Sequence, residues 1–295
     1  PSGCAGQQII MNTISSQLSA MSQRLNAAGI ESAQVEAELL LSHVLGVGRG
    51  EMLSKQAVGE SLTETQLAEL AELLARREKR EPLQHLTGTA NFRNLTLKVG
   101  LGVFVPRVET EIVTQLAIDI LSSAAGESPM AIDLGTGSGA IALSLATEVP
   151  HASVYAVELS PEALPFTRAN FAAIAPEATL LEGDMSKLPA ELDGRFSLVV
   201  SNPPYIPTDM VPRDPEVRDY EPQLALYGGG DDGLDTIRLV SKAGQRLLHT
   251  GGSLAIEHAD IQAESVTQLL LADGWRQIRS HKDLSGRDRA ITALK

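Results

Sequence analysis

The sequence predicts an α/β protein in which a mostly parallel sheet, with helices on both faces, follows a small helical domain. Two observations lead to this prediction. Between about residues 12 and 80, apolar residues recur at spacings of three and four, which is typical of helices. From Met130 onward, short β-rich runs alternate with helical segments, as in a parallel sheet whose strands are joined by helices. A chain of 295 residues is long enough for both domains.

The N-terminal region predicts helices that together form a domain over residues 1–84. The first helix ends at Gly29, and the next begins after Ser32 and ends at Gly46. A further helix begins near Thr63 and ends in the basic run 76–81, RREKRE. We interpret this run as a solvated helix end, and a docking surface for an acidic partner is the alternative. The apolar positions expected to define the first two helices are Ile14, Leu18, Met21, Leu25, Val35, Leu39, Leu40, Val44 and Leu45.

Residues 85–107 predict a β-hairpin linker. Leu95, Leu97 and Val99 alternate with polar residues, which is the pattern of a half-buried strand. After Pro106, the acidic residues Glu109 and Glu111 lead into a helix. The catalytic domain is then expected to extend over residues 108–295.

Within this larger domain the predicted strands are short and rich in β-branched residues. Predicted helices lie near residues 141–146, 162–173, 234–248 and 260–271. The last segment, 275–295, resembles two β segments joined by a charged loop and predicts a hairpin-like addition to the sheet. The expected strands are MAIDL (130–134), SVYAVE (153–158), ATLLEG (178–183), FSLVVSN (196–202) and GSLAIEH (252–258).

Composition and charge exclude several classes of function. The net charge of −13 and pI near 4.9 argue against non-specific binding to a nucleic-acid backbone. The single cysteine, Cys4, excludes an internal disulfide, and no Cys/His cluster has the spacing of metal ligands. Both facts fit a reducing cytoplasm. We also expect no signal peptide in PSGCAGQQII and no membrane span.

A glycine-rich loop directly follows the first predicted strand and precedes a helix. Glycines allow a tight turn and a close approach of the backbone to a ligand, and the helix offers free N–H groups. The loop lacks the Gly-Lys-Ser/Thr of a P-loop and the spacing of the dinucleotide fingerprint. It therefore indicates a nucleotide-like ligand of another kind. It comprises Asp133, Leu134, Gly135, Thr136, Gly137, Ser138 and Gly139.

Acidic residues end the strands that follow this loop. Glu158 ends the second strand about 20 residues later, a distance at which a carboxylate can accept from ribose hydroxyls. Asp184 ends the third strand and can accept from an adenine amino group, while Met185 packs on the ring. Asp133 can pair with the ammonium of an amino acid. Each acid alone is more often a strand-end cap, but together they indicate an adenosine that carries an amino acid, S-adenosylmethionine.

The fourth strand ends in Ser201-Asn202-Pro203-Pro204-Tyr205. Asn202 Oδ1 and the backbone carbonyls accept hydrogen bonds, and the prolines offer no competing N–H. Tyr205 can stack on a flat amide or base. Taken alone, the motif is compatible both with a clamp for an NH2 group and with a plain turn. Ligands bind at the carboxyl edge of such sheets, and the predicted S-adenosylmethionine site lies at the same edge. We therefore expect this motif to bind the NH2 group that receives the methyl group.

The order of several segments resembles the protein-(glutamine-N(5)) methyltransferases that modify peptide-chain release factors. The resemblance covers nearly the whole chain, and VPRVETE and YEPQLAL are more specific to this family than SNPPY, which adenine- and guanine-modifying enzymes share. It implies a Rossmann-like methyltransferase fold with a seven-stranded, mostly parallel sheet and an N-terminal substrate-recognition domain. The segments are FRNLTLKV (92–99), VPRVETE (105–111), DLGTGSG (133–139), SNPPY (201–205) and DYEPQLALYGGGDDGL (219–234).

The resemblance also implies roles for residues. The glycine loop, Glu158, Met185 and Asn202 would contact the methyl donor. Asn202, Pro203, Pro204 and Tyr205 would hold the glutamine of the Gly-Gly-Gln loop in a release factor. Arg107, Glu109 and Glu111 would shape the site and contact donor or substrate, whereas an ion-paired helix start is the alternative. This chain departs from the family at two positions. The family often has proline where this chain has Val108, and often aspartate where it has Glu158.

Other functions remain open from the sequence. A sister activity methylates a glutamine of a large-subunit ribosomal protein and shares the same site. An adenine-N(6) methyltransferase would need a basic face, which the net charge of −13 disfavours. A non-catalytic binding module is disfavoured by the intact Asn202–Tyr205 motif. We expect a monomer that uses no metal, with release factors as partners and no direct binding to nucleic acid or membranes.

Overall fold

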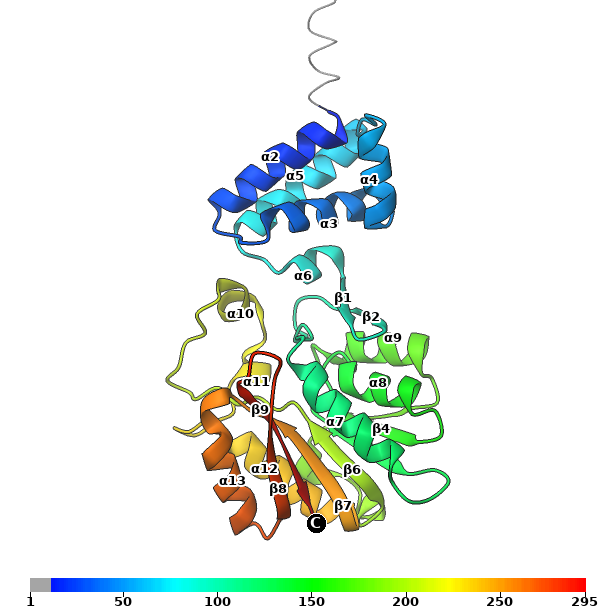
Figure 1. Ribbon diagram of the computed structural model, residues 1–295, viewed down its shortest axis with the longest axis vertical. Helices are drawn as coiled ribbons and strands as arrows, with labels where there is room; N and C mark the ends of the chain where they lie inside the picture. The colour runs from blue at the N-terminus through cyan, green and yellow to red at the C-terminus, as the bar shows by residue number, and fades with distance from the viewer. Residues whose placement is uncertain (1–11) are drawn as a thin grey trace, which may run out of the picture. The chain divides into compact units, whose positions relative to one another are not determined.

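The computed structural model describes residues 12–295, which divide into two compact units (Figure 1). The first, here the helical unit, contains the described residues up to Gly88 together with Asp214–Tyr220. The second, the catalytic unit, contains Thr89–Arg213 and Glu221–Lys295. Residues 214–220 thus belong to the helical unit, although the sequence places them inside the predicted catalytic domain. The expectations about Cys4 and an N-terminal signal lie outside the described residues.

The helical unit contains the helices that the apolar spacing predicts. The Thr63 hydroxyl and the Gln66 side chain form a reciprocal capping box at the start of α5, which satisfies two otherwise free backbone N–H groups. Gly29 and Gly46 adopt φ values of 76° and 65° just after α2 and α3, conformations that favour glycine. The sequence interpretation missed three short helices, α4, α6 and α10. The helices are α2 (Ile14–Ala27), α3 (Ala33–Leu45), α4 (Arg49–Ala57), α5 (Glu64–Glu78), α6 (Leu83–Thr87) and α10 (Pro215–Tyr220).

The buried face of α3 differs from the expected one. Val35 and Leu39 are 43% and 38% exposed, whereas Leu40 and Leu41 are fully buried. The helix is apolar around most of its circumference, so apolar spacing alone could not determine which side packs against the other helices.

The interpretation of the run 76–81 as a solvated helix end is wrong for Arg77. Its side chain is buried, and its guanidinium donates to Glu36 and, at 2.9 Å, to Glu216. Burial lowers the pKa of Arg77, but hydrogen bonds and charge attraction from the two glutamates outweigh it and raise that pKa. A buried cation with bidentate carboxylate partners is a packing element and not a solvated charge.

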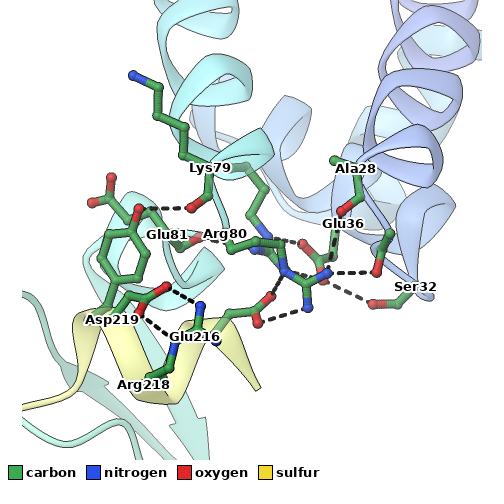
Figure 2. A network of polar contacts seen from close by, with 12 residues as sticks. Ala28, Ser32, Glu36, Lys79, Arg80, Glu81, Glu216, Arg218 and Asp219 are labelled. Carbon is green, nitrogen blue, oxygen red and sulfur yellow. Dashed lines mark hydrogen bonds and ion pairs between the residues drawn. The ribbon is translucent and has the colours of Figure 1, made fainter. Parts of the chain in front are cut away.

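Short helix α10 is held in the helical unit by polar contacts. Glu216 accepts from Arg77 at 2.9 Å and from Arg80 Nη2 at 2.8 Å, and Figure 2 shows Arg80, Glu36 and Glu216 gathered in one network. The Tyr220 hydroxyl donates to the Lys79 carbonyl at 2.9 Å. A six-residue helix is too short to be stable alone, so these contacts determine its position.

We expect Glu216→Ala to release α10 from the helical unit. The variant leaves Arg80 without its carboxylate and Arg77 with one partner fewer, at a cost of about 1–3 kcal/mol because these hydrogen bonds join charged groups. Hydrogen exchange of residues 214–220 should become faster. Asp219→Ala is the matched control, because Asp219 pairs only with its neighbour Arg218 on the exposed side of the helix. Equal exchange in the two variants would contradict the assignment.

The catalytic unit is built on the predicted seven-stranded sheet, whose strand order is β5-β4-β3-β6-β7-β9-β8. Strands β3 to β7 pair in parallel, and β9 pairs antiparallel with β7 and β8. The chain extends from β3 outward to β5 and returns to β6 on the other side of β3, which makes this the switch point of the sheet. The strands are β3 (Met130–Leu134), β4 (Ser153–Glu158), β5 (Thr179–Glu182), β6 (Phe196–Ser201), β7 (Leu248–Glu257), β8 (Arg276–Lys282) and β9 (Asp288–Leu294).

Helices cover both faces of this sheet (Figure 1). On one face α7, α8 and α9 pack on strand residues such as Ala131 and Val200, together with Phe92 of the small hairpin. On the other face α12 and α13 pack on Ile132, Val199 and neighbouring side chains. Alternation between the faces follows from the two-residue period of a strand. The remaining elements are β1 (Thr89–Phe92), β2 (Leu95–Lys98), α7 (Thr110–Ser122), α8 (Ala140–Glu148), α9 (Leu164–Ile174), η1 (Met185–Lys187), η2 (Ala190–Leu192), α11 (Gln223–Leu226), α12 (Asp235–Leu247), η3 (Asp260–Gln262) and α13 (Ala263–Ala272).

The two segments at the end of the chain are also as predicted. Strands β8 and β9 form an antiparallel pair, and β9 joins this pair to the sheet through β7. The hairpin β1–β2 agrees with the expected linker strand at Leu95 and Leu97. Within residues 12–295, no helix combines the length and apolarity needed to cross a lipid bilayer.

Candidate active site

A cavity of about 380 Å³ lies at the carboxyl ends of β3, β4, β5 and β6 in the catalytic unit. This is the volume of a typical small-molecule site. It brings together most of the predicted site residues from four separate strand ends. The predicted residues that line it are Gly135, Thr136, Gly137, Ser138, Glu158, Asp184, Met185, Asn202, Pro203, Pro204 and Tyr205. Asp133, Gly139, Arg107, Glu109 and Glu111 do not line it.

The glycine loop between β3 and α8 presents its backbone to this cavity. Gly137 has a φ of 57°, and a Cβ at this residue would meet no atom within 4 Å, so the space beside it is open. The Gly137 N–H donates to Glu158 Oε2 at 2.7 Å. The loop and the end of β4 therefore form one rigid wall.

The acids after β4 and β5 also lie at the cavity. Glu158 is buried and accepts from the backbone N–H groups of Gly137 and Ser160, both at 2.7 Å. Two lone pairs of its oxygens remain available, because a carboxylate can accept about four hydrogen bonds. Asp184 accepts from the Ser186 backbone and hydroxyl, which lower its pKa and keep it ionised. Both residues can accept hydrogen bonds from a ligand in the cavity.

Asp133 lies beneath the loop and is almost fully buried. Its Oδ2 accepts from the Thr136 hydroxyl at 2.6 Å and from the Ala142 N–H at 3.3 Å. Burial raises the pKa of Asp133 to about 7. Its Oδ1 has no partner among the described residues. An ammonium group near this oxygen would satisfy it and favour the charged carboxylate.

The Asn202–Tyr205 motif follows β6, whose six residues are all buried. Asn202 Nδ2 donates to the Thr110 hydroxyl oxygen at 3.0 Å. No described residue donates to Asn202 Oδ1, which is free to accept from a ligand. The Tyr205 hydroxyl donates to Glu257 at 3.3 Å, and burial raises its pKa. The motif therefore offers acceptors to the cavity, while the Asn202 amide and the Tyr205 hydroxyl each donate to another residue of the protein.

The segment 221–228, which contains part of YEPQLAL, fixes the shape of this motif. The Ile206 N–H donates to the Leu226 carbonyl at 2.9 Å, and the Gly228 N–H donates to the Ile206 carbonyl at 3.0 Å. A Cβ at Gly228 would lie 2.7 Å from the Pro204 carbonyl oxygen, so this close approach requires glycine. Segments distant in sequence thus form one surface.

In the VPRVETE segment, Arg107 and Glu111 have partners elsewhere in the protein, whereas Glu109 makes no side-chain capping bond. Arg107 donates to Glu221 at 2.6 Å and lies 5.1 Å from the centre of the Phe104 ring. Glu109 precedes α7 as its cap residue, and Glu111 accepts from the Arg93 N–H at 3.1 Å. The contacts of Arg107 support the wall of the cavity, since Phe104 lines it.

Sequence reasoning missed Thr110, Glu221 and Glu257. Thr110 lies between Glu109 and Glu111 in the VPRVETE segment, and its hydroxyl oxygen accepts from Asn202. Glu221 belongs to YEPQLAL, is buried, and accepts from Arg107 and the Val105 N–H. Burial raises its pKa to about 7, although Arg107 opposes this shift. For Thr110 and Glu221 the only available signal was their position inside the two segments that carried the resemblance, and Glu257 lies in neither segment but at the end of the predicted strand 252–258.

The cavity fits a methyl donor of the S-adenosylmethionine type. The open backbone of Gly137, which lines the cavity, suits a closely approaching ligand. Glu158 and Asp184 supply acceptors for hydroxyl and amino groups at two further strand ends. In the described part of the chain, no three His, Cys, Asp or Glu side chains gather into a possible metal site.

Known proteins match both parts of the chain. The family model described as the PrmC N-terminal domain matches residues 17–88, and the methyltransferase small domain matches residues 94–211. A protein of Streptomyces coelicolor named release factor glutamine methyltransferase is 46% identical over 97% of this chain and 99% of its own. A protein of Bifidobacterium longum with the same name is 43% identical, over 92% of this chain and 96% of its own length.

A solved structure from Alicyclobacillus acidocaldarius is titled protein-(glutamine-N5) methyltransferase (release factor-specific). It is 30% identical, covers 67% of this chain and 98% of its own, and superimposes with a TM-score of 0.41. The decisive match is the one in sequence, because it extends over nearly the full length of both chains. On this basis, the chain belongs to the family of release factor glutamine methyltransferases.

Proposed function

We propose that this protein transfers a methyl group from S-adenosylmethionine to the side-chain amide nitrogen of a glutamine in a peptide-chain release factor. The glutamine is that of the Gly-Gly-Gln loop. The observation that carries the proposal is the Asn202 Oδ1 beside the cavity, on a carboxamide whose NH2 group donates to Thr110. A site rich in acceptors suits an NH2 group. Family membership supports the choice of a protein glutamine.

The difficulty of the reaction lies in the nucleophile, because an amide nitrogen shares its lone pair with its carbonyl. Bound S-adenosylmethionine supplies a methyl group on a positively charged sulfur that leaves as a neutral thioether. Asn202 Oδ1 and the Pro203 carbonyl accept the two N–H bonds of the substrate amide and orient its nitrogen. Tyr205 and the two prolines pack around the flat amide. Both acceptors also stabilise the positive charge that develops on nitrogen in the transition state.

Positioning is the main contribution of these residues. When the reacting groups are held in line about 3–3.5 Å apart, the activation free energy falls by roughly 7–11 kcal/mol relative to reactants that meet by diffusion. Gly135, Gly137, Glu158, Asp184 and Met185 hold the donor in this scheme. After transfer the proton leaves to water, so no side chain is assigned as a general base. No metal takes part.

The helical unit is proposed to recognise the release factor, and residues 85–107 to link it to the catalytic residues. The protein is proposed to act as a monomer in the cytoplasm, where release factors work. Its net charge of −13 disfavours a nucleic-acid backbone as the substrate surface.

The test is incubation with labelled S-adenosylmethionine and a purified release factor, followed by mass spectrometry of the product. We expect one methyl group on the Gly-Gly-Gln glutamine, and no label when this glutamine is replaced by alanine. Label on a large-subunit ribosomal protein or on an adenine oligonucleotide, with none on the release factor, would overturn the proposal.

A further inference from the structure

Two side chains of helix α9 hold the carbonyl groups of the glycine loop. The Thr167 hydroxyl donates to the Gly137 carbonyl at 2.6 Å, and Asn170 Nδ2 donates to the Ser138 carbonyl at 2.8 Å. Thr167 and Asn170 are three positions apart and therefore lie on the same face of the helix. Both are buried, and neither lines the cavity. The loop is thus fixed by side chains that do not belong to the cavity wall.

The N–H groups of the loop are held mainly from β4. The N–H groups of residues 135 and 136 both donate to the Val157 carbonyl at 2.9 Å, and that of Gly137 donates to Glu158 at 2.7 Å. From residue 135 to residue 139, only the Ser138 N–H has no acceptor among the described residues. Ser138 lines the cavity. One backbone donor of the loop is therefore left for a ligand.

The peptide group between Gly137 and Ser138 links these two observations. A trans peptide group is planar, and its C=O and N–H point in opposite directions. Because the Gly137 carbonyl faces Thr167, the Ser138 N–H points away from α9. Gly137 has a φ of 57°, and glycine tolerates either sign of φ, so the backbone alone does not prevent this peptide group from turning over. The Thr167 hydroxyl determines which way it faces.

Asn170 also connects the loop to a second part of the cavity wall. Its Oδ1 accepts from the Lys98 N–H at 2.7 Å, and its Nδ2 donates to the Lys98 carbonyl at 3.0 Å as well as to the loop. Both N–H groups and the oxygen of the carboxamide are therefore used within the protein. Lys98 ends β2, and Gly102 and Phe104 that follow it line the cavity. One buried carboxamide thus fixes the glycine loop and the end of β2 together.

We propose that Thr167 and Asn170 are positioning residues that hold the glycine loop in the conformation that binds the methyl donor. The inference rests on the proposed function, in which S-adenosylmethionine occupies this cavity. The donor carries a carboxylate, hydroxyl groups and ring nitrogens, all of which can accept from the Ser138 N–H. A loop that is fixed before the donor arrives loses less conformational entropy on binding, so the donor binds more tightly. Both residues act on the affinity for the donor without touching it.

The first test compares Thr167→Val with Thr167→Ser. Valine has nearly the shape of threonine but cannot donate to the Gly137 carbonyl, whereas serine keeps the hydroxyl. Without this bond the loop spends less time in its binding conformation, and the apparent dissociation constant rises by the same factor. We expect calorimetry to give a dissociation constant of S-adenosylmethionine about tenfold higher in Thr167→Val, as for loss of a buried hydrogen bond, and close to wild type in Thr167→Ser. Equal values for Thr167→Val and wild type would overturn the inference.

Two comparisons separate positioning from a general loss of stability. Thr267→Val makes the same change in α13, where the Thr267 hydroxyl donates to the Ala263 carbonyl of its own helix at 2.7 Å. Its affinity for the donor should equal that of wild type, and a loss as large as in Thr167→Val would contradict the inference. In single-turnover assays with purified release factor, Thr167→Val should lower the affinity for the donor more than the rate at saturating donor. The reverse order would also contradict it.

Asn170→Asp tests the second residue. The aspartate still accepts from the Lys98 N–H, but its ionised carboxylate has no proton to donate to the Ser138 or Lys98 carbonyl. We expect the affinity for S-adenosylmethionine, measured by calorimetry at about pH 8, to fall at least as far as in Thr167→Val. A wild-type affinity in this variant would remove Asn170 from the proposal.

A further readout uses the wild-type protein alone and does not depend on how any variant folds. In a ¹⁵N-labelled protein, the backbone amide signal of Ser138 should shift when S-adenosylhomocysteine, the product without the transferable methyl group, is added. Its exchange with water should become slower. A signal that is unchanged in the bound protein would defeat the inference. A wild-type protein that binds the donor but methylates no release factor would defeat the proposed function and not this inference.

Discussion

Asn202→Ala should abolish methyl transfer while the protein still binds its methyl donor. The variant removes Oδ1, the acceptor that we assign to the substrate amide, and leaves the glycine loop, Glu158 and Asp184 unchanged. Removal of one polar group that stabilises a transition state costs on the order of 10²–10³-fold in kcat. Loss of the second contact, to Thr110, adds to this because the loop is less firmly held.

Two measurements separate the role of Asn202 from simple damage to the cavity. Single-turnover assays give the rate of transfer, and calorimetry gives the dissociation constant of S-adenosylmethionine. Asn94→Ala is the matched control, because Asn94 is an exposed residue in the turn between β1 and β2. A donor affinity that falls as far as the rate would refute the assigned role of Asn202.

Arg107→Ala should strongly destabilise the catalytic unit. The Glu221 side chain is fully buried, and Arg107 is the charged partner within 2.6 Å. Breaking a buried ion pair by removing one partner costs about 3–5 kcal/mol, because the other charge remains buried. The expected result is a lower midpoint of thermal or urea unfolding. The double variant Arg107→Met/Glu221→Leu should recover most of the loss, since it leaves no unpaired charge.

The pH dependence of this variant follows from Glu221. Burial raises the pKa of Glu221 to about 7 in the folded protein, above the ordinary value of 4.5, and Arg107 opposes this rise. The folded state therefore binds the proton more tightly than the unfolded state between these values. Stability should fall as pH rises through this range, and in Arg107→Ala the fall should continue to higher pH than in wild type, because loss of Arg107 raises the pKa of Glu221 further. A variant whose stability is the same at about pH 5.5 and about pH 8 would be inconsistent with an unpaired Glu221.

Sequence patterns predicted the strands and the ligand-binding edge because both depend on local features. Strand β6 is a continuous apolar run, and the glycine loop follows β3 directly. Parallel strands place their carboxyl ends on one edge, so topology alone collects the residues that follow them. Asn202, Glu158 and Asp184 follow three of these strands, and all three line the cavity.

The contacts that sequence reasoning missed join residues far apart in the chain. Arg77 pairs with Glu36, 41 positions away, and with Glu216, 139 positions away. In sequence it resembles an ordinary charge at a helix end. Glu257 resembles the polar end of a strand, and only its register beside β6 brings it behind Asn202. Such roles are set by packing and charge burial, which local patterns do not encode.

Helix α10 has a consequence for the modularity of the protein. The chain enters the catalytic unit after Gly88, returns to the helical unit for Asp214–Tyr220 and leaves it again at Glu221. If the chain were divided after Gly88, Glu216 and Tyr220 would be separated from their partners. Glu216 would lose Arg77 and Arg80, and Tyr220 would lose the Lys79 carbonyl. A helical unit exchanged between relatives would therefore have to be transplanted as two pieces, residues up to 88 together with 214–220. The second piece ends one residue before Glu221, so such a graft would join the chain directly at the buried ion pair with Arg107.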